Sequence, residues 1–223
     1  MVSNQNIAAI IVAGGDGRRA GGSVPKQWKK ISGKPVLEWT VSKFLNHPKI
    51  TQVIIVIKNS KTFDSRKAFN AKVCVAEAGL NRTQSVFNGL RIVSKEISHV
   101  LIHDGVRPCV SKTLISNVIE KLGFFESVIP TLNITDSLWK FNSAKETLSS
   151  PTNRNLFKTT QTPQGFDYIK IFEAYNANSE STTDCAALAI KSGLSLTTVD
   201  GEIENIKITY KSDFKIAKLF LEN

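Results

Sequence analysis

Residues 7–27 read IAAIIVAGGDGRRAGGSVPKQ, an apolar run that passes directly into a turn rich in glycine and arginine. The run Ile7–Val12 is typical of a strand. Glycines that follow a strand let the main chain approach a bound anion, and their N–H groups point toward it. Arg18, Arg19 and Lys26 add the positive charge that suits a polyphosphate. The stretch therefore predicts a nucleotide triphosphate site at the end of a strand, and the alternative is an ordinary surface turn with incidental basic residues.

Other phosphate-binding motifs fit this turn less well. Residues Gly15–Ala20 match the dinucleotide fingerprint G-x-G-x-x-A, but that fingerprint opens a helix at once, and here further glycines and Pro25 follow. The P-loop pattern fails because Gly33 and Lys34 run into Pro35. The partner motifs of a protein kinase are also absent. A loop of the nucleotidyltransferase kind remains as the best interpretation.

Composition limits the class of protein. The chain has 223 residues, of which 41% are hydrophobic and 22% charged, so we expect one globular domain over residues 1–223. The net charge of +10 comes from scattered basic residues, which favours a small polyanionic substrate over nucleic acid. Three distant cysteines without C-x-x-C spacing indicate a reducing compartment, and no apolar stretch is long enough to span a membrane. We therefore expect a soluble, cytoplasmic protein.

Short β-branched runs alternate with stretches of helical period, which predicts an α/β fold with a mainly parallel sheet. The expected strands are 7–12, 52–57, 72–76, 99–103, 127–130 and 194–199. The expected helices are 36–46, 82–94, 112–122, 168–177, 183–192 and 212–221. Within 82–94, the side chains of Val86, Leu90 and Val93 share one face, as in a helix that covers a core.

Residues 131–153 interrupt this alternation. Their weak period of two predicts a β-hairpin arm that projects from the sheet. The arm carries Leu138, Trp139 and Phe141 with few neighbours to bury them, so a second subunit is the expected partner. The alternative is a hairpin that folds back on its own domain.

Several polar segments follow the expected strands, and ligands of open α/β sheets bind at the carboxyl ends of strands. They are GLNRTQS (79–85), HDGVRP (103–108), NR (153–154), QTPQ (161–164) and NIKIT (205–209). Together with the glycine loop and PKQ, and in this order, they resemble the 2-C-methyl-D-erythritol 4-phosphate cytidylyltransferase family. The resemblance extends from Ile7 to about Phe220. It implies a Rossmann-like nucleotidyltransferase three-layer sandwich with a projecting β-hairpin arm, and a homodimer whose arms interlock.

The resemblance also implies an activity and a nucleotide site. The enzyme would transfer a cytidylyl group from CTP to 2-C-methyl-D-erythritol 4-phosphate, releasing pyrophosphate, in isoprenoid precursor synthesis. Arg19 and Lys26 resemble the pair that neutralises the triphosphate as charge develops. The residues expected to contact the rest of the nucleotide are Ala13, Gly14, Gly15 and Gly17 through their backbone, Gly79 and Ser85 at the cytosine, and Asp104 and Arg107 near the ribose and phosphate. Asp104 and Arg107 could alternatively form a buried structural ion pair.

The acceptor site follows from the same resemblance. Arg154 and Lys207 resemble the residues that hold the acceptor phosphate in line with the α-phosphorus, and Ser137 keeps a hydroxyl in the arm motif. A phosphate monoester is largely ionised at neutral pH, so no general base is needed, and His103 is interpreted as a structural histidine. Mg²⁺ would bridge phosphate oxygens, with Asp104 as the nearest candidate to contact the ion or its waters.

This chain departs from the family pattern in a few places. Gly14 and Gly105 stand where alanine is usual, Leu80 replaces a polar residue, and three extra residues separate Pro130 from Asp136 in the arm motif. The sister family of ribitol-5-phosphate cytidylyltransferases shares most motifs and is the nearest alternative. An NAD-dependent oxidoreductase and a nucleic-acid-binding module are alternatives from other classes.

Overall fold

The computed structural model describes residues 6–16, 24–60, 69, 73–178, 182 and 184–222. Its main sheet has eight strands: β1 (Ile7–Val12), β4 (Ile50–Ile57), β5 (Val73–Glu77), β6 (His99–Asp104), β7 (Ser127–Asn133), β10 (Lys158–Thr160), β11 (Gln164–Asp167) and β12 (Leu196–Asp200). The order is β10-β7-β11-β6-β1-β4-β5, with β12 paired to β7. The β1–β4, β1–β6, β4–β5 and β7–β12 pairs are parallel, whereas β10 and β11 run antiparallel to their neighbours. The sheet is therefore open and mainly parallel, as predicted.

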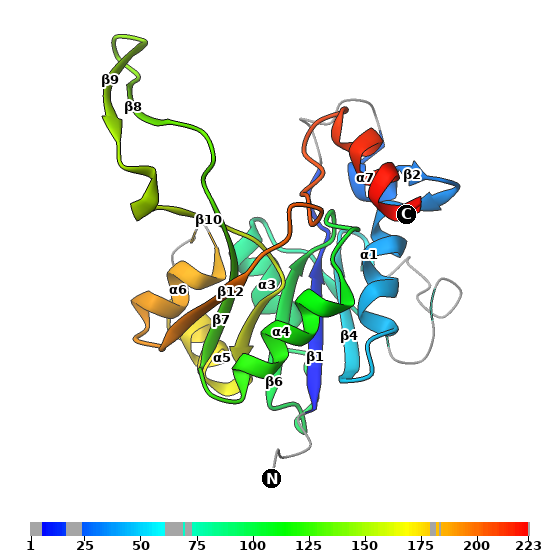
Figure 1. The fold of residues 1–223 in the computed structure, drawn as a ribbon. Helices are drawn as coiled ribbons and strands as arrows, with labels where there is room; N and C mark the ends of the chain where they lie inside the picture. Colours follow the sequence, from blue (N-terminus) through cyan, green and yellow to red (C-terminus); the bar gives the residue numbers. More distant parts are fainter. Residues whose placement is uncertain are drawn as a thin grey trace.

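Helices cover both faces of the sheet and make the predicted three layers (Figure 1). One face packs against α1 (Val36–Leu45) and α4 (Lys112–Leu122), and the other against α3 (Arg82–Leu90), α5 (Tyr168–Ala177) and α6 (Cys185–Lys191). Along β1, Ile7, Ala9 and Ile11 belong to the first core, and Ala8 and Ile10 to the second. The strand is buried on both faces because helices lie on both, which explains its unbroken apolar run.

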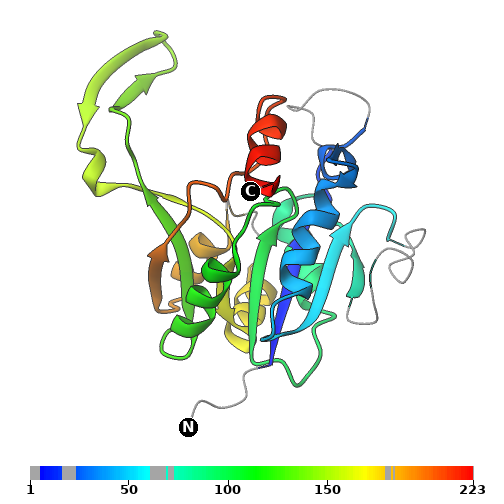
Figure 2. The ribbon, with the colours of Figure 1, turned by 45° about the vertical axis from the view of Figure 1, so that its right-hand side comes forward.

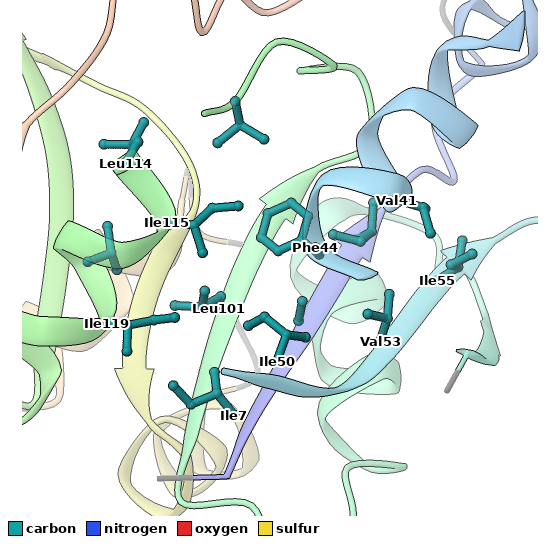
Figure 3. Close-up of a cluster of buried hydrophobic side chains, with 14 of the residues drawn as sticks. Ile7, Val41, Phe44, Ile50, Val53, Ile55, Leu101, Leu114, Ile115 and Ile119 are labelled. Carbon is teal, nitrogen blue, oxygen red and sulfur yellow. The ribbon is translucent and has the colours of Figure 1, made fainter. Parts of the chain in front are cut away.

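The first core joins residues that are distant in the sequence. Figure 3 shows Val41 and Phe44 of α1 and Leu114, Ile115 and Ile119 of α4 gathered over the same face of the sheet. Phe44 is fully buried. Burying a side chain of this size stabilises the fold by roughly 1.5–3 kcal/mol.

A smaller cluster lies above the carboxyl ends of the strands. Here α7 (Asp213–Glu222) packs beside the short hairpin of β2 (Lys30–Ile31) and β3 (Lys34–Pro35). Ile31, Ile208 and Ala217 are buried in this cluster. The N–H of Ile208 also donates to the carbonyl of Val106 at 2.9 Å. These contacts fix the segment 205–209 over the end of the sheet.

The predicted hairpin is present and projects away from the rest of the molecule, which we call the body (Figures 1 and 2). It pairs β8 (Leu138–Asn142) with β9 (Thr147–Thr152). The alternative in which the hairpin folds back on its own domain is wrong. The expected start of the arm at residue 131 is also wrong, because β7 continues to Asn133 and Thr131 is buried in the sheet. We use the word arm for residues 134–157.

Three local differences have physical causes. The sequence did not predict β11, whose Gly165 lies so close to α4 that a Cβ would come within 2.7 Å of Leu122 and Val118. Helix α3 ends at Leu90 rather than at residue 94. The N–H of Ser94 donates to the Gln52 side chain of β4 at 3.0 Å. Helix α6 begins at Cys185 because the Asp184 side chain caps it, accepting the N–H of Ala187.

No helix among the described residues has the length and apolar character needed to cross a membrane.

Candidate active site

A cleft of about 400 Å³ opens at the carboxyl ends of β1, β4, β5 and β6. The sequence predicted a site at this edge of the sheet. Its lining residues are Val12, Ala13, Gly14, Gly15, Asp16, Lys26, Gln27, Lys58, Gly79, Leu80, Asn81, Arg82, Ser85, Asp104, Val106 and Lys207. The cleft thus brings together most of the residues that were expected to bind the nucleotide.

The first part of the glycine loop is held tightly against the sheet. The Gln27 side chain donates from Nε2 to the carbonyls of Ala13 at 2.8 Å and Gly15 at 2.9 Å. A Cβ on Gly14 would come within 2.3 Å of Ala78, whereas one on Gly15 would meet nothing within 4 Å. Gly15 therefore leaves room for a ligand. Gln27 belongs to the PKQ motif, but the spacing of that motif predicts no role for its side chain.

Two residues predicted for this loop, Gly17 and Arg19, lie outside the described residues. The other predicted triphosphate residue, Lys26, lines the cleft and donates from Nζ to the carbonyl of Ile208 at 2.7 Å. This contact ties the end of the glycine loop to the segment 205–209. Lys26 therefore lies in the same cleft as Lys207.

The predicted cytosine-reading residues contact each other at the start of α3. The Ser85 hydroxyl accepts the N–H of Gly79 at 3.0 Å and donates to the carbonyl of Asn81 at 2.8 Å. Asn81 in turn caps the helix by accepting the N–H of Gln84. Leu80 stands at the rim with 98% of its surface exposed. The backbone of residues 79–81 is thus fixed by side chains of its own turn.

Three cations surround the carboxylate of Asp104. Lys207 Nζ lies 3.0 Å away, Arg107 Nε 3.2 Å and Arg82 Nη2 3.7 Å. Burial alone would raise the pKa of Asp104, but the charges of Lys207, Arg82 and Arg107 outweigh burial and hold that pKa well below its usual range. The carboxylate is therefore ionised, and it orients the Lys207 ammonium at the centre of the site. The Asp104–Arg107 pair is buried, as the structural alternative predicts, and Asp104 also lines the cleft. A role of the two residues near the ribose and phosphate stays a prediction.

This arrangement does not suit Asp104 as a direct Mg²⁺ ligand. A divalent cation there would be repelled by the three cations that already contact the carboxylate. Within the described part of the chain, no group of three or more His, Cys, Asp or Glu residues could hold a metal ion. The protein groups at Asp104 therefore do not fit a directly bound Mg²⁺ ion.

A second hollow of about 230 Å³ adjoins the cleft. It is lined by Arg82, Asp104, Arg107, Thr160, Gln161, Thr162, Gln164, Asp184 and Lys207. The two hollows share Arg82, Asp104 and Lys207. A ligand in each would therefore meet at the Asp104–Lys207 pair.

Contacts of the His103 ring hold the loop that follows Asp104 in place. Its Nε2 lies 3.1 Å from the carbonyl of Arg107, and its Nδ1 lies 3.0 Å from the Thr162 hydroxyl, which also accepts the N–H of Asp104. These contacts assign the ring proton to Nε2. Burial lowers the pKa of His103 to about 4. A neutral ring with both nitrogens engaged agrees with its interpretation as a structural histidine.

Arg82 lines both hollows, although the motif that contains it predicted no role for this side chain. Its Nη1 donates to the Sγ of Cys185 at 3.2 Å, and the Tyr175 hydroxyl donates to the same sulfur at 3.2 Å. Cys185 and Tyr175 are buried. The sulfur therefore helps to hold the guanidinium toward Asp104. Sequence reasoning missed this contact because the partners are 103 residues apart.

The predicted acceptor residues do not all come together in one chain. Lys207 lies at the junction of the hollows, but Arg154 and Ser137 belong to the arm and line neither hollow formed by the described residues. The Arg154 guanidinium donates to the carbonyl of Thr135, within the arm itself. A single chain thus presents Lys207 without Arg154.

A family model described as "IspD: 2-C-methyl-D-erythritol 4-phosphate cytidylyltransferase" matches residues 7–223. The chain belongs to this family. Membership makes the protein a cytidylyltransferase, an enzyme of the nucleotidyltransferase class. It confirms the family inferred from the motifs, and it gives no support to the ribitol, oxidoreductase or nucleic-acid alternatives.

Relatives of this IspD-family chain are of two lengths. The 2-C-methyl-D-erythritol 4-phosphate cytidylyltransferase of Neorickettsia sennetsu is 38% identical over 227 residues, which cover 96% of this chain and 97% of the relative. A bifunctional enzyme IspD/IspF of Ruegeria pomeroyi is also 38% identical, over 96% of this chain but 56% of its own length. The chain thus spans about half the length of the bifunctional relatives that it matches.

Solved structures of the IspD family share the fold. The 4-diphosphocytidyl-2C-methyl-D-erythritol synthase of Anaerococcus prevotii has a TM-score of 0.84 and 26% identity, covering 100% of this chain and 98% of its own. The cytidylyltransferase of Thermus thermophilus has a TM-score of 0.80 and 26% identity, covering 96% and 98%. These matches confirm the predicted α/β architecture.

Proposed function

We propose that this chain transfers the cytidylyl group of CTP to 2-C-methyl-D-erythritol 4-phosphate and releases pyrophosphate. The observation that carries the proposal is the pair of adjoining hollows that share Arg82, Asp104 and Lys207. The larger hollow begins at a glycine loop, as a nucleotide site does, and the smaller can hold the acceptor. Lys207, at their junction, is available to both phosphate groups.

In the proposed reaction, an oxygen of the acceptor phosphate attacks the α-phosphorus of CTP. The bond between that phosphorus and the bridging oxygen breaks, and pyrophosphate leaves with the electron pair. The acceptor arrives ionised, so no side chain has to remove a proton. Lys26 and Lys207 stabilise the charge that develops on the phosphate oxygens. Arg19 is proposed for the same role through the family resemblance alone.

We also propose how the nucleotide is oriented. Gly79 and Ser85 lie at the cytosine, where backbone groups fixed by the turn 79–81 give a rigid reading edge. The backbone of Ala13, Gly14 and Gly15 is proposed to approach the phosphates. Gly17 is proposed for the same role through the family resemblance alone. Asp104 positions Lys207 rather than reacting itself, and Arg107 supports Asp104 through their buried ion pair. Mg²⁺ is proposed to arrive with the CTP phosphates, where it would neutralise phosphate charge.

The placement of the arm supports a homodimer. Trp139, Phe141 and Leu148 are 49%, 63% and 62% exposed on it, and a second copy could cover them. Arg154 and Ser137 would then enter the acceptor hollow of the other copy.

Mixing Arg154→Ala with Lys207→Ala protein tests this arrangement, because a heterodimer would keep one intact site. We expect about a quarter of wild-type activity after random exchange. Recovery of no activity would place Arg154 and Lys207 in the same chain's site.

The proposed function has a direct test. Pyrophosphate release is measured from CTP and Mg²⁺ with 2-C-methyl-D-erythritol 4-phosphate and, in parallel, with ribitol 5-phosphate as the control. Turnover with the first alone is expected. Turnover with ribitol 5-phosphate alone would contradict the proposed acceptor and keep the CTP site.

The cytoplasm is proposed as the location of the protein, which the three free cysteines support.

A further inference from the structure

The mouth of the nucleotide cleft holds an ion pair that the proposed reaction does not use. Lys58 follows β4 and lines the cleft, and its Nζ lies 2.5 Å from Oδ1 of Asp16, at the start of the glycine loop. The side chains are 54% and 52% exposed, respectively. A cation therefore stands on the rim of a proposed polyphosphate site and is held there by a carboxylate.

The turn that carries Lys58 is fixed by its neighbours. The Glu77 carboxylate, at the end of β5, accepts the N–H of Asn59 at 2.9 Å and the N–H of Ser60 at 2.8 Å. Asn59 adopts a φ of 59°, a left-handed conformation that asparagine tolerates well. The N–H of Ala78 donates to the carbonyl of Ile57 at 2.8 Å on the same edge. The backbone at Lys58 is thus anchored, while its side chain is exposed and lines the cleft.

The Asp16–Lys58 contact is one that a polyphosphate can replace. Exposed ion pairs contribute only about 0–1 kcal/mol, because water screens them and long side chains lose freedom. A triphosphate carries several negative charges and many acceptor oxygens, so it offers the ammonium a stronger partner than one carboxylate. The Asp16 carboxylate, by contrast, would be repelled by the same phosphates.

We propose that Lys58 is a further binding residue for the triphosphate of CTP, and that Asp16 holds it in the nucleotide-free enzyme and competes with the phosphates. This inference rests on the proposed function, because it requires CTP in the cleft. It assigns opposite effects to the two partners. Lys58 strengthens nucleotide binding, and Asp16 weakens it.

The test is equilibrium binding of CTP with Mg²⁺ and without acceptor, so that no turnover occurs. Lys58→Met should raise the Kd for CTP about tenfold, as loss of one charge-assisted contact does. Asp16→Asn should lower the Kd about threefold, because it removes the competing charge. The matched control is Lys95→Met, which changes the net charge equally at an exposed residue beyond α3, outside the cleft. Its Kd should stay within twofold of wild type. Cytidine, which lacks phosphates, should bind all four proteins equally.

The outcomes separate this inference from the function on which it rests. If wild type bound no CTP, the proposed function would fail with it. If wild type bound CTP but Lys58→Met and Asp16→Asn raised the Kd equally, the ion pair would be a structural contact and the inference would be wrong. Weaker binding in Asp16→Asn alone would show that the carboxylate assists the nucleotide, which also overturns it. Circular dichroism of each variant checks that the fold is intact.

Discussion

In the body, the carboxylate of Asp104 contacts three cations within 3.7 Å, and the glycine loop is held by Gln27. On the arm, by contrast, Trp139, Phe141 and Leu148 expose 49–63% of their surface, and the Arg154 guanidinium donates a hydrogen bond to the arm's own backbone. Among the described residues, the charged cluster at Asp104 is thus paired within one chain, whereas the arm leaves apolar side chains exposed for a partner to cover. We propose that one chain supplies the CTP half of the site and that the acceptor half also needs the arm of a second copy.

The largest expected effect concerns the body. Lys26→Ala should lower kcat by a factor of about 10² or more, because it removes charge that stabilises the transition state. Steady-state pyrophosphate release measures it. Lys29→Ala is the matched control, because Lys29 lies three residues further on and contacts the Phe214 ring instead of lining the cleft. A Lys26→Ala enzyme that turned over at the wild-type rate would show that the catalytic cleft has been assigned wrongly.

The second prediction concerns the stability of the fold at low pH. The body should lose stability and the arm should not contribute to the loss, since all three histidines belong to the body. Burial lowers the pKa of His103 to about 4, against about 6.5 in an unfolded chain. Between these values the unfolded chain binds a proton that the native protein does not. Stability is therefore full above pH 6.5 and falls as the pH drops toward 4, by on the order of 3 kcal/mol. Burial lowers the pKa of His47 and His99 as well, which acts in the same direction.

Urea unfolding at pH 7 and pH 4.5 measures this loss. The His103→Gln variant should lose less stability over the same interval, provided that it folds. Should it not fold, the ring-proton NMR signal of His103 in wild type gives the pKa directly. A native His103 that titrates near pH 6.5 would contradict the prediction.

The sequence predicted the body well where one local rule decides the structure. Ile7–Val12, Lys112–Leu122 and Tyr168–Ala177 were predicted to the residue. The strand is a continuous apolar run, and in the two helices the apolar period agrees with the capping residues. Prediction from the sequence failed at β11, a four-residue strand containing Gly165, whose pairing with β6 and β7 depends on residues far away in the chain. Period and propensity carry no information about such partners.

The same limit applies to the site. The motifs placed Lys26, Asp104 and Lys207 at one edge of the sheet, and the cleft contains all three. The roles of Gln27 and Cys185 could not be predicted, because they depend on contacts across the fold rather than on spacing. Arg154 could be predicted as a phosphate ligand only by resemblance. Its position outside both hollows depends on the path of the arm, which no local pattern encodes.

The third prediction separates the two halves of the proposed site. Arg154→Ala should lower kcat/KM for the acceptor about 30-fold, the loss expected for one charge-assisted hydrogen bond of about 2 kcal/mol. The Kd for CTP should stay unchanged, because Arg154 does not line the cleft. Lys140→Ala, on β8 of the same arm, is the control for lost charge. Weaker CTP binding in Arg154→Ala would show that the two halves are not separable.

The smallest expected effect tests where the two halves join. Cys185→Ala removes the sulfur that accepts hydrogen bonds from Arg82 and Tyr175, so the guanidinium should lose one of its anchors beside Asp104. We expect the KM for the acceptor to rise about fourfold with kcat nearly unchanged, since positioning is lost but no charge is removed. Cys185→Ser should restore most of the affinity, because the hydroxyl can also accept these hydrogen bonds.

Cys109→Ala is the matched control for that variant, because Cys109 is another buried thiol, near α7, and burial raises its pKa to about 11. Removing its sulfur should lower Tm through the small cavity that it leaves and should not change either KM. If Cys185→Ala and Cys109→Ala behaved alike, the sulfur of Cys185 would only fill space. A KM effect confined to Cys185 would mean that a residue of the second core sets the position of a cation shared by both hollows. In that case the junction between the halves, unlike the arm, is completed by the chain itself.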